Sequence, residues 1–243
     1  MMDQKIESLN RALKESKYTV VLCGSGVLEE EGIYMLKKPE RAYEIELKYG
    51  VSPEYIYSDG YYSTRPDKFF EFYRNEILID IEPGDTPKKL AELERAGLIH
   101  YVISSNIYNL SGRAGCKNVI NLHGNIYDNR CPHCQRSYPS EYIKNQSKVP
   151  RCESCGSVIR PKVSLFGDML DGQIIAKTAT EIEKADVLLI LGTSLDSDVF
   201  HNYIKYFEGS RLILVHKEPH LKDKHADLVI YDEPKNVLNA LEL

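Results

Sequence analysis

Four of the chain's six cysteines fall into two closely spaced pairs. Cys131 and Cys134 form one C-x2-C pair, and Cys152 and Cys155 form a second pair after seventeen intervening residues. A C-x2-C turn presents two thiolates on one side of a tight knuckle, and two knuckles together make the tetrahedral sulfur site that zinc prefers. Because four cysteines close the coordination sphere, we predict one structural Zn2+ and not a catalytic metal. His133, inside the first pair, is the alternative ligand.

A glycine-rich turn, Gly24-Ser25-Gly26, follows the apolar run from Tyr18 to Cys23. A strand that leads through such a turn into a helix is typical of sites where backbone N–H groups meet a phosphate. Three glutamates, Glu29 to Glu31, follow closely. We place them in the first turn of a helix, where carboxylates suit the helix dipole, or on a solvated helix face. In either position they need not face the phosphates.

Composition restricts the classes of partner. The chain has 243 residues, a formal net charge of −5 and no block of basic residues, which argues against a nucleic-acid-binding surface. Its first residues are polar and helical, unlike a signal peptide, and no apolar run approaches membrane-spanning length. We therefore expect a cytoplasmic protein with no membrane partner, in which Cys23 and Cys116 are reduced core residues. The oligomeric state is left open.

Apolar strands alternate with amphipathic helices along most of the chain, and these elements must position the residues above. This alternation indicates an α/β fold with a parallel sheet covered on both faces. The clearest helix of the tyrosine-rich region 27–80 is TRPDKFFEFYRNEIL, with Pro66 at its start. We predict strands over residues 18–23, 98–104, 118–122, 186–191, 211–215 and 227–230, and further helices around 85–97, 173–184, 198–207 and 234–243.

Six short motifs occur in a defined order along the sequence. They are the glycine-rich turn, Ser105-Asn106-Ile107, Asn121-Leu122-His123-Gly124, the two cysteine knuckles, the segment from Arg160 to Asp168, and Gly192-Thr193-Ser194-Leu195. In this order the chain resembles the sirtuins, NAD-dependent protein deacylases, over nearly its whole length. Each motif alone is weakly specific, and the six together are specific.

The resemblance implies a Rossmann-like large domain with a small zinc-binding domain inserted into it. We assign residues 1–30, 80–127 and 161–243 to the NAD-binding large domain, 31–79 to a helical small-domain or cofactor-loop segment, and 128–160 to the zinc-binding module. NAD, as co-substrate, and an acylated protein or peptide lysine are expected in the cleft between the domains.

The resemblance also implies roles for individual residues. His123 corresponds to the general base, and histidine titrates near neutral pH, so it can take a proton from a ribose hydroxyl. From its position alone, His123 would be a buried structural histidine. The segment from Val163 to Gly167, which includes Phe166, would pair with the substrate backbone by adding a strand to an exposed edge. Asn106 would lie near the nicotinamide ribose. The expected cofactor-binding residues are Gly24, Ser25, Gly26, Ser105, Asn106, Gly192, Thr193, Ser194 and His216.

The chain departs from the family pattern mainly at the nicotinamide end. The usual Gly-Ile-Pro-Asp-Phe-Arg run reads Gly-Ile-Tyr-Met-Leu-Lys here, so Tyr34 replaces the proline and Lys37 replaces the arginine. Lysine keeps the charge of arginine without its forked geometry. The aspartate that contacts the nicotinamide amide is Tyr108, and the glutamine two residues before Ile107 is Ser105. His216 replaces the asparagine expected beside the adenine ribose and keeps a hydrogen-bonding group.

These departures leave three functions open. The first is an NAD-dependent protein lysine deacylase, which transfers the acyl group from lysine to ADP-ribose and releases nicotinamide. The second is an NAD glycohydrolase or ADP-ribosyltransferase, which the loss of the aspartate at position 108 would favour. The third is a non-catalytic protein that binds NAD or ADP-ribose, because the adenosine end of the pattern is nearly intact.

The tyrosine-rich segment that replaces the usual cofactor loop has two interpretations. It forms a pocket for an unusual acyl group, lined by Arg41, Tyr43, Arg65 and Tyr73, in which an arginine would favour an acidic acyl chain. Alternatively, it is a helical lid whose tyrosines pack its own core.

Overall fold

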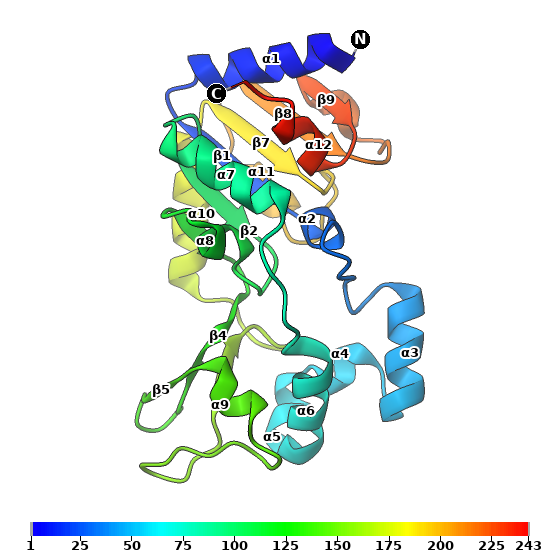
Figure 1. The fold of residues 1–243 in the computed structure, drawn as a ribbon, viewed down its shortest axis with the longest axis vertical. Helices are drawn as coiled ribbons and strands as arrows, with labels where there is room; N and C mark the ends of the chain where they lie inside the picture. Colours follow the sequence, from blue (N-terminus) through cyan, green and yellow to red (C-terminus); the bar gives the residue numbers. More distant parts are fainter. Residues whose placement is uncertain (1, 243) are drawn as a thin grey trace. The chain divides into compact units, whose positions relative to one another are not determined.

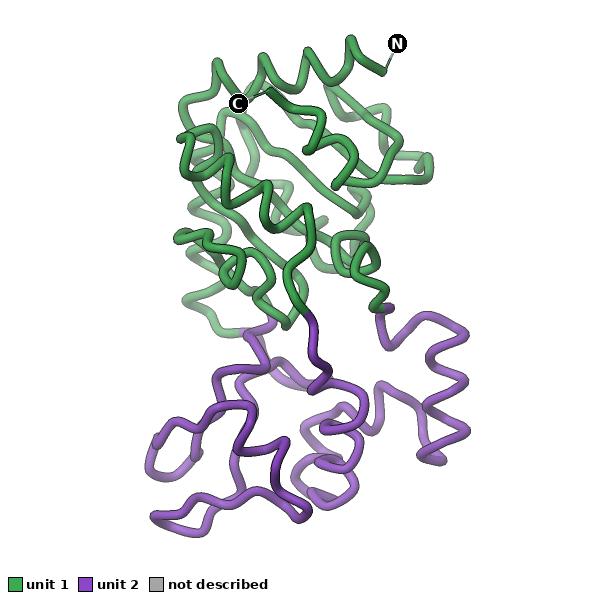
Figure 2. Tube along the Cα trace, viewed as in Figure 1, with its two compact units in different colours: residues 1–33, 82–122, 171–243 green, residues 34–81, 123–170 purple. Residues whose placement is uncertain are grey.

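The structure is a computed structural model that describes residues 2–242, and it divides into two compact units (Figures 1 and 2). Unit 1 comprises residues 1–33, 82–122 and 171–243, and unit 2 comprises residues 34–81 and 123–170. Within residues 2–242, no helix combines the length and the apolar composition needed to span a bilayer.

Unit 1 is built on a six-stranded sheet whose paired strands are all parallel, in the order β3-β2-β1-β7-β8-β9. The predicted parallel α/β sheet is therefore confirmed. The two central strands are buried at every residue, which suits a sheet covered on both faces. The strands are β1 (Thr19–Cys23), β2 (Tyr101–Ser104), β3 (Val119–Asn121), β7 (Val187–Leu191), β8 (Arg211–His216) and β9 (Leu228–Tyr231).

Alternate residues of each strand enter two separate hydrophobic clusters, one on each face of the sheet. In β1, Val21 packs with the cluster that includes α1, α7 and α12, whereas Val20 and Leu22 pack with the cluster that includes α10. Figure 1 shows α7 and α10 on opposite faces of the sheet. The helices of unit 1 are α1 (Met2–Glu15), α2 (Ser25–Glu29), α7 (Asp85–Arg95), α8 (Leu110–Ala114), α10 (Gly172–Lys184), α11 (His201–Ile204), α12 (Pro234–Asn239) and the 3-10 turn η2 (Asp223–His225).

Unit 2 combines a helical segment with a small antiparallel sheet of order β5-β4-β6. Its helices α3 and α6 begin at Pro39 and Pro66, which need no N–H partner at a first helical position. Its elements are α3 (Pro39–Tyr49), α4 (Pro53–Ile56), α5 (Asp59–Thr64), α6 (Pro66–Phe72), the π-helix η1 (Tyr73–Ile77), β4 (Gly124–Arg130), β5 (Ser137–Tyr138), α9 (Ser140–Lys144) and β6 (Arg160–Val163).

An aromatic cluster forms the core of the helical segment. The Phe69 and Tyr73 rings stack with centroids 5.6 Å apart, and Phe69 meets Phe70 edge to face at 5.2 Å. Tyr57 stacks on both Phe69 and Tyr73, with centroids 6.4 Å away in each case. Pairs in these geometries add to the burial energy of the rings. Tyr57 and Tyr73 thus pack the core of the segment itself, as the helical-lid interpretation expects.

The boundaries of the two units differ from the domain limits assigned from sequence. The helical segment and the cysteine-containing region belong to one unit, and this unit extends through residues 123–127 and 161–170. The physical reason is strand pairing: β4 pairs with β5 and β6, and neither β4 nor β6 pairs with the parallel sheet. Figure 2 shows the resulting division along the chain.

Candidate functional site

The glycine-rich turn and the turn after β7 pack against each other at the carboxyl edge of the parallel sheet. Gly24 N donates to Leu191 O (2.9 Å), and Gly26 N donates to Gly192 O (2.8 Å). A Cβ atom on Gly26 would lie 2.7 Å from Gly192 Cα, and Gly192 adopts a φ of +63°, so both positions need glycine. The two glycine amides are therefore not free to meet a phosphate. Within residues 2–242, only the Ser25 amide of this turn has no protein acceptor.

Thr193 continues this packing from the other side. A Cβ atom on Gly24 would lie 2.7 Å from Thr193 Cγ2, so the first glycine makes room for the threonine side chain. Ser194 follows in the loop before α11, where its carbonyl accepts from Ser197 N (3.2 Å). The two sequence motifs that the resemblance assigned to one nucleotide are thus in direct contact within unit 1.

The glutamates after the glycine-rich turn do not occupy the first turn of a helix, and that prediction is wrong. Helix α2 ends at Glu29, and Glu30 lies just beyond it. The Glu30 carboxylate accepts from Thr86 Oγ1 (2.6 Å) and from Lys235 N (2.9 Å). Both donors lie in first turns, of α7 and α12, so the carboxylate meets the N-termini of two other helices. Its burial raises the pKa of Glu30.

Asn106 and Ser105 follow β2 and are held by bonds within unit 1. Ser105 N and Ser105 Oγ both donate to Cys23 O, at 3.1 and 3.2 Å. Asn106 Nδ2 donates to Ser104 Oγ (2.8 Å), and Asn106 Oδ1 accepts from Tyr108 N (3.0 Å). Asn106 is therefore fixed in one rotamer and is buried at the carboxyl edge of β2. Tyr108, which replaces the usual aspartate, is buried as well.

His216 ends β8, the neighbour of β7 in the sheet, and is buried. Its Nε2 lies 3.3 Å from Oδ1 of the equally buried Asp223. Sequence reasoning named His216 but missed Asp223. The stretch EPHLKDKHAD is polar and carries four other charged residues, so no signal in it singles out one buried carboxylate.

His123 lies in unit 2, directly before β4. Its carbonyl accepts from Ser164 N (2.9 Å), and burial lowers the pKa of its imidazole. Gly124 adopts a φ of +71° where β4 meets β6, with no room for a Cβ atom beside Lys162 O. The leucine-histidine-glycine sequence therefore has a local explanation: the glycine lets the strand bend while the histidine stays neutral at its end.

The segment from Val163 to Gly167 is already partly paired within unit 2. Phe166 N donates to Tyr57 O (3.0 Å), and Phe166 O accepts from Asp59 N (3.1 Å). The backbone N–H and C=O of Phe166 are thus already paired with the helical segment, which leaves its side chain for a substrate contact. Arg160 holds the end of the segment through an ion pair with Asp168 (2.6 Å), which also accepts from Leu165 N (2.7 Å).

The four cysteines converge to one site. Their sulfur atoms all lie within 4.8 Å of one another, with Cys131 to Cys155 at 3.3 Å, Cys134 to Cys152 at 3.4 Å and Cys134 to Cys155 at 3.9 Å. A zinc ion about 2.3 Å from each sulfur in a tetrahedron separates the sulfurs by about 3.8 Å. The cluster therefore fits one structural zinc ion bound by four thiolates.

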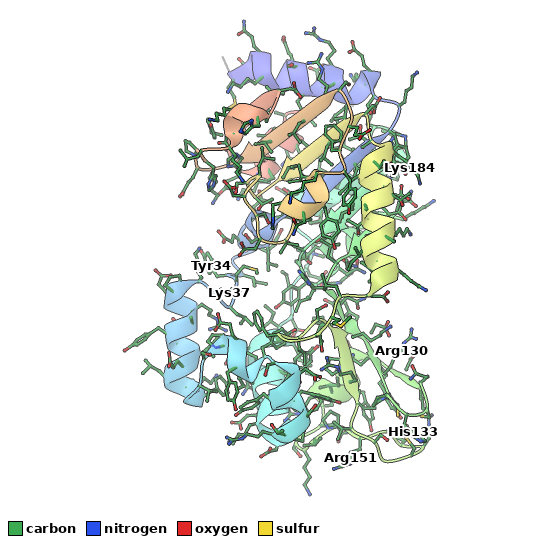
Figure 3. The ribbon with its side chains drawn as sticks, turned by 180° about the vertical axis from the view of Figure 1, so that it is seen from behind. Tyr34, Lys37, Arg130, His133, Arg151 and Lys184 are labelled. Carbon is green, nitrogen blue, oxygen red and sulfur yellow. The ribbon has the colours of Figure 1, made fainter. Side chains whose placement is uncertain are left out.

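The two knuckles repeat the same hydrogen bonds. Cys131 O accepts from Gln135 N (3.0 Å) and Cys152 O accepts from Gly156 N (2.8 Å), so each pair closes a tight turn. Three or more histidine, cysteine or acidic side chains that converge could hold a metal ion. Among residues 2–242, the group that converges in this way is this cluster of four cysteines. His133 is exposed near the outer end of the module and does not belong to it (Figure 3).

The residues of the tyrosine-rich segment that one interpretation placed around an acyl pocket lie in different surroundings. Arg41 forms ion pairs with Glu76 and with Glu44, so it is not an unpaired cation that awaits an acidic acyl chain. Tyr73 is fully buried in the aromatic core, whereas Tyr43 is 64% exposed on the outside of α3. Arg65 lies over the Tyr61 ring, with Cζ 5.8 Å from its centroid. The buried Tyr73 and the exposed Tyr43 therefore do not line one pocket together.

The substituted loop residues Tyr34 and Lys37 lie just before α3 (Figure 3). The Tyr34 ring is half exposed and is covered by Lys38 Nζ, 3.8 Å from its centroid. Lys37 Nζ lies 5.2 Å from the centroid of the Phe166 ring, which is a cation–π distance. The lysine that replaces the usual arginine therefore contacts the segment assigned to the substrate.

Comparison with known proteins identifies the family. The profile described as "Sir2 family" matches residues 24–198. An NAD-dependent protein deacetylase of Clostridium acetobutylicum is 35% identical over 239 residues, covering 98% of both chains. One from Staphylococcus aureus is 32% identical over 241 residues, covering 99% of each.

Solved structures agree with these relatives. A sirtuin structure from work on the structural basis of sirtuin substrate affinity superposes with a TM-score of 0.86 at 28% identity, and the match covers 96% of each chain. A Sir2 protein bound to a p53 peptide and NAD+ gives a TM-score of 0.81 at 27% identity, covering 96% of this chain and 95% of that one. The matches span the parallel sheet, the cysteine cluster and the histidine motif together. This chain therefore belongs to the Sir2 family.

Proposed function

We propose that the protein is an NAD-dependent protein lysine deacylase, which moves the acyl group of an acylated lysine to ADP-ribose and releases nicotinamide. The observation that carries this proposal is the link between His123 and the substrate segment: Ser164 N donates to His123 O (2.9 Å) inside unit 2. A neutral histidine is thereby fixed next to the segment that would hold the acyl-lysine. Full-length relatives named as NAD-dependent protein deacetylases support the same reaction.

Deacylation by this route proceeds in consecutive steps. The acyl oxygen of the substrate attacks C1′ of the nicotinamide ribose, and the bond to nicotinamide breaks. A ribose hydroxyl must then lose its proton to attack the acyl carbon. His123, kept neutral by burial, accepts that proton and later returns it. Water completes the exchange: the bond from the acyl carbon to the lysine nitrogen breaks, the free lysine amine leaves, and the acyl group remains on a ribose oxygen.

The remaining roles divide between the two units. In unit 1, Asn106 is held rigidly enough to orient a ribose, and among the described residues the Ser25 amide is the backbone N–H of the glycine-rich turn that has no protein acceptor. In unit 2, the four-cysteine zinc site ties the knuckle between β4 and β5 to the knuckle before β6. We assign nucleotide contacts to Gly24 and Gly26, whose lack of side chains and not their paired amides would let the ligand approach, and to Ser25, Ser105, Asn106, Gly192, Thr193, Ser194 and His216. We assign substrate contacts to Val163, Phe166 and Gly167, and zinc to Cys131, Cys134, Cys152 and Cys155.

Purified zinc-loaded protein with NAD tests the assignment. Mass spectrometry should detect deacylated product from at least one member of a panel of acyl-lysine peptides with short, long and acidic acyl groups. His123→Ala should abolish the product, while its melting temperature and its ADP-ribose affinity stay near those of the wild-type protein. No product across the panel, or a His123→Ala variant as active as the wild type, would contradict the proposal.

A second function has one specific observation in its favour. Tyr108 stands buried where the family places an aspartate, so no carboxylate at this position contacts the nicotinamide amide. With a tyrosine at this position, the enzyme would transfer ADP-ribose from NAD to water or to another acceptor, as an NAD glycohydrolase or an ADP-ribosyltransferase does. Nicotinamide released from NAD without any peptide, measured by chromatography, would favour this function. Release that requires the acylated peptide would exclude it.

A further inference from the structure

A buried histidine–aspartate pair closes the carboxyl end of β8. His216 is 4% exposed and Asp223, the first residue of η2, is 5% exposed. His216 Nε2 lies 3.3 Å from Asp223 Oδ1. Two polar side chains with so little contact with water need a physical reason to be there, because burying polar groups costs free energy unless they are paired.

The Asp223 carboxylate is held in place by its other oxygen. Oδ2 accepts from His220 N (2.8 Å) and from the Tyr231 hydroxyl (3.0 Å). Within residues 2–242, Oδ1 is a buried acceptor with no well-aligned donor, and the His216 ring is the group that faces it. Nε2 likewise has no well-aligned partner, and at 3.3 Å a proton on Nε2 is within reach of this oxygen. The pair therefore favours the tautomer of His216 that carries its proton on Nε2.

This tautomer leaves Nδ1 of His216 as a hydrogen-bond acceptor. Nδ1 is buried and has no partner among the described residues. Burial lowers the pKa of His216 by more than the Asp223 carboxylate and the Glu218 backbone raise it, so the ring is neutral at physiological pH and, in this tautomer, Nδ1 keeps its lone pair. The other titratable groups that face the ring are His220 and Tyr231, whose ring centroids lie 5.2 and 5.6 Å from that of His216. Neither supplies a donor to Nδ1.

The position of His216 indicates which ligand could supply the donor. The strand order reverses between β1 and β7, and ligands of such sheets bind at the carboxyl ends of the strands beside the reversal. Gly192, at the carboxyl end of β7, donates to Val215 O (2.8 Å), which directly precedes His216. His216 thus lies next to the turn of residues 192–194 that we assign to the nucleotide.

We propose that Asp223 is a positioning residue for nucleotide recognition: it holds His216 in the Nε2–H tautomer, so that Nδ1 accepts a hydrogen bond from a hydroxyl of the adenine nucleotide. This inference rests on the proposed function, because it takes NAD as the ligand of this edge. An asparagine can donate or accept, whereas a neutral histidine fixed in this way only accepts. Nδ1 is covered by protein atoms, so the entering hydroxyl displaces part of that cover.

Nitrogen-15 NMR of the histidine side chains in the full-length, zinc-loaded protein tests the first step. At pH 7.5 the His216 signals, assigned by comparison with His216→Asn, should show the pattern of a neutral ring protonated at Nε2. In Asp223→Asn, the amide oxygen can keep the His220 and Tyr231 donors, which turns its NH2 group towards Nε2. The proton of His216 should then move to Nδ1. A wild-type ring protonated at Nδ1 would overturn the proposal, and this measurement needs no variant of Asp223.

Calorimetric titration with ADP-ribose tests the second step, because this ligand lacks nicotinamide and avoids the altered end of the site. Asp223→Asn should bind about tenfold more weakly than the wild type, which corresponds to about 1.4 kcal/mol. In a His216→Asn background, the same Asp223→Asn change should alter the affinity less than about twofold. Asp227→Asn is the matched control, since Asp227 is exposed and accepts from Leu212 N at the opposite end of β8. It should leave both the tautomer and the affinity unchanged.

The outcomes separate this inference from the proposed function. If the wild-type protein does not bind ADP-ribose, the nucleotide site itself is wrong. If the wild type binds and a folded Asp223→Asn variant binds equally well, only the role of Asp223 is overturned. An equal loss of affinity from Asp223→Asn in the wild-type and His216→Asn backgrounds would also overturn it, because the effect would then be structural and would not pass through the imidazole.

Discussion

The His123 imidazole is partly buried, which favours its neutral form, the form that a general base needs. Removing the ring from water penalises its charged form and lowers its pKa. A base with a lowered pKa stays unprotonated further into acid than a solvent-exposed histidine. The same burial weakens its proton affinity, so the ring binds the ribose proton and releases it again within one turnover.

The pH dependence of deacylation should reflect this burial. We expect kcat/KM for an acyl-lysine peptide to stay on its plateau at the ordinary histidine pKa of about 6.5 and to fall only at lower pH. The measurement is a pH profile of kcat/KM, with ADP-ribose affinity followed in parallel to separate binding from chemistry. An acid limb centred at or above pH 6.5 would mean that His123 is not the group that titrates.

Single residues also show which parts of the site can be predicted from sequence. The four zinc ligands were identified because their spacing is a local signal that a metal requires. Glu30 was misplaced because its partners, Thr86 and Lys235, come from helices far along the chain. Asp223 was missed for the same reason, since its burial depends on β9 and on the loop after β8. Charges whose partners are distant in sequence look like solvated surface charges.

Among the elements, α3 is joined to the π-helix η1 by one buried carboxylate. Glu76 accepts hydrogen bonds from Lys48 Nζ and from the Tyr49 hydroxyl, both at 2.7 Å, and pairs with Arg41. Burial by itself raises the pKa of Glu76, but these hydrogen bonds and the Arg41 charge outweigh it and leave the pKa below its ordinary value. Glu76 thus favours the folded helical segment in its ionised form.

Glu76→Gln should destabilise unit 2 by about 2 kcal/mol at pH 7, less than for a fully buried pair because Arg41 and Lys48 reach water. The contribution of a depressed carboxyl is present above its ordinary pKa of 4.5 and is lost as the pH falls through the folded value. The difference between the wild type and the variant should therefore shrink below about pH 4.5. Urea unfolding at pH 7 and again below pH 4.5, followed by the near-ultraviolet circular dichroism of the tyrosines, measures this difference in the free energy of unfolding.

Glu44→Gln is the matched control for this change. Its carboxylate pairs with the same Arg41 but is 66% exposed, so its loss should cost less than about 0.5 kcal/mol. Equal effects of the two substitutions would show that the burial of Glu76 does not matter.

The zinc site joins the two cysteine knuckles of unit 2. Cys152→Ser should lose most of the bound zinc and lower the melting temperature, because a structural zinc site contributes directly to folding. Cys116→Ser is the control: it changes a buried thiol outside the cluster, whose pKa burial raises to about 12. Metal analysis by mass spectrometry should find one zinc ion per chain in the wild type and in Cys116→Ser. Equal zinc in Cys152→Ser would contradict the four-cysteine assignment.

Strands were predicted well where burial alone defines them. β1, β7 and β8 are almost wholly apolar because helices cover both faces of the sheet, and such runs are visible in a sequence. β4 has the sequence GNIYDNR and was not predicted, because it lies in a small sheet, only two of its seven residues are buried, and it pairs through a bulge. Helix α11 spans only His201–Ile204, since the loop before it is fixed by turns within residues 194–201.

At the scale of the whole molecule, the chemistry is divided between two separately packed units. The glycine-rich turn, Asn106 and His216 lie in unit 1, whereas His123, the segment from Val163 to Gly167 and the zinc ligands lie in unit 2. Each unit has its own hydrophobic or aromatic core. A ligand that contacts only unit 1 should therefore stabilise that unit directly.

This division predicts a pattern of hydrogen exchange when ADP-ribose binds. A ligand at one hundred times its Kd stabilises its binding unit by about 2.7 kcal/mol, so amides of the sheet β1, β7 and β8 should exchange about one hundredfold more slowly where they exchange by unfolding. Amides of the aromatic helix α6 in unit 2 should change much less. Mass spectrometry of proteolytic fragments measures both regions in one experiment.

Gly192→Ala supplies the control that ties this protection to the carboxyl edge of the sheet. An added Cβ atom would lie 2.7 Å from Val27 N in a residue with a φ of +63°, so the two turns could no longer pack together. The variant should lose ADP-ribose binding and the ligand-induced protection of unit 1, while α6 and the zinc content remain as in the wild type. Equal protection of both units by ADP-ribose in the wild type would show that the nucleotide stabilises the molecule as one cooperative body, and the assignment of its adenosine half to unit 1 alone would fail.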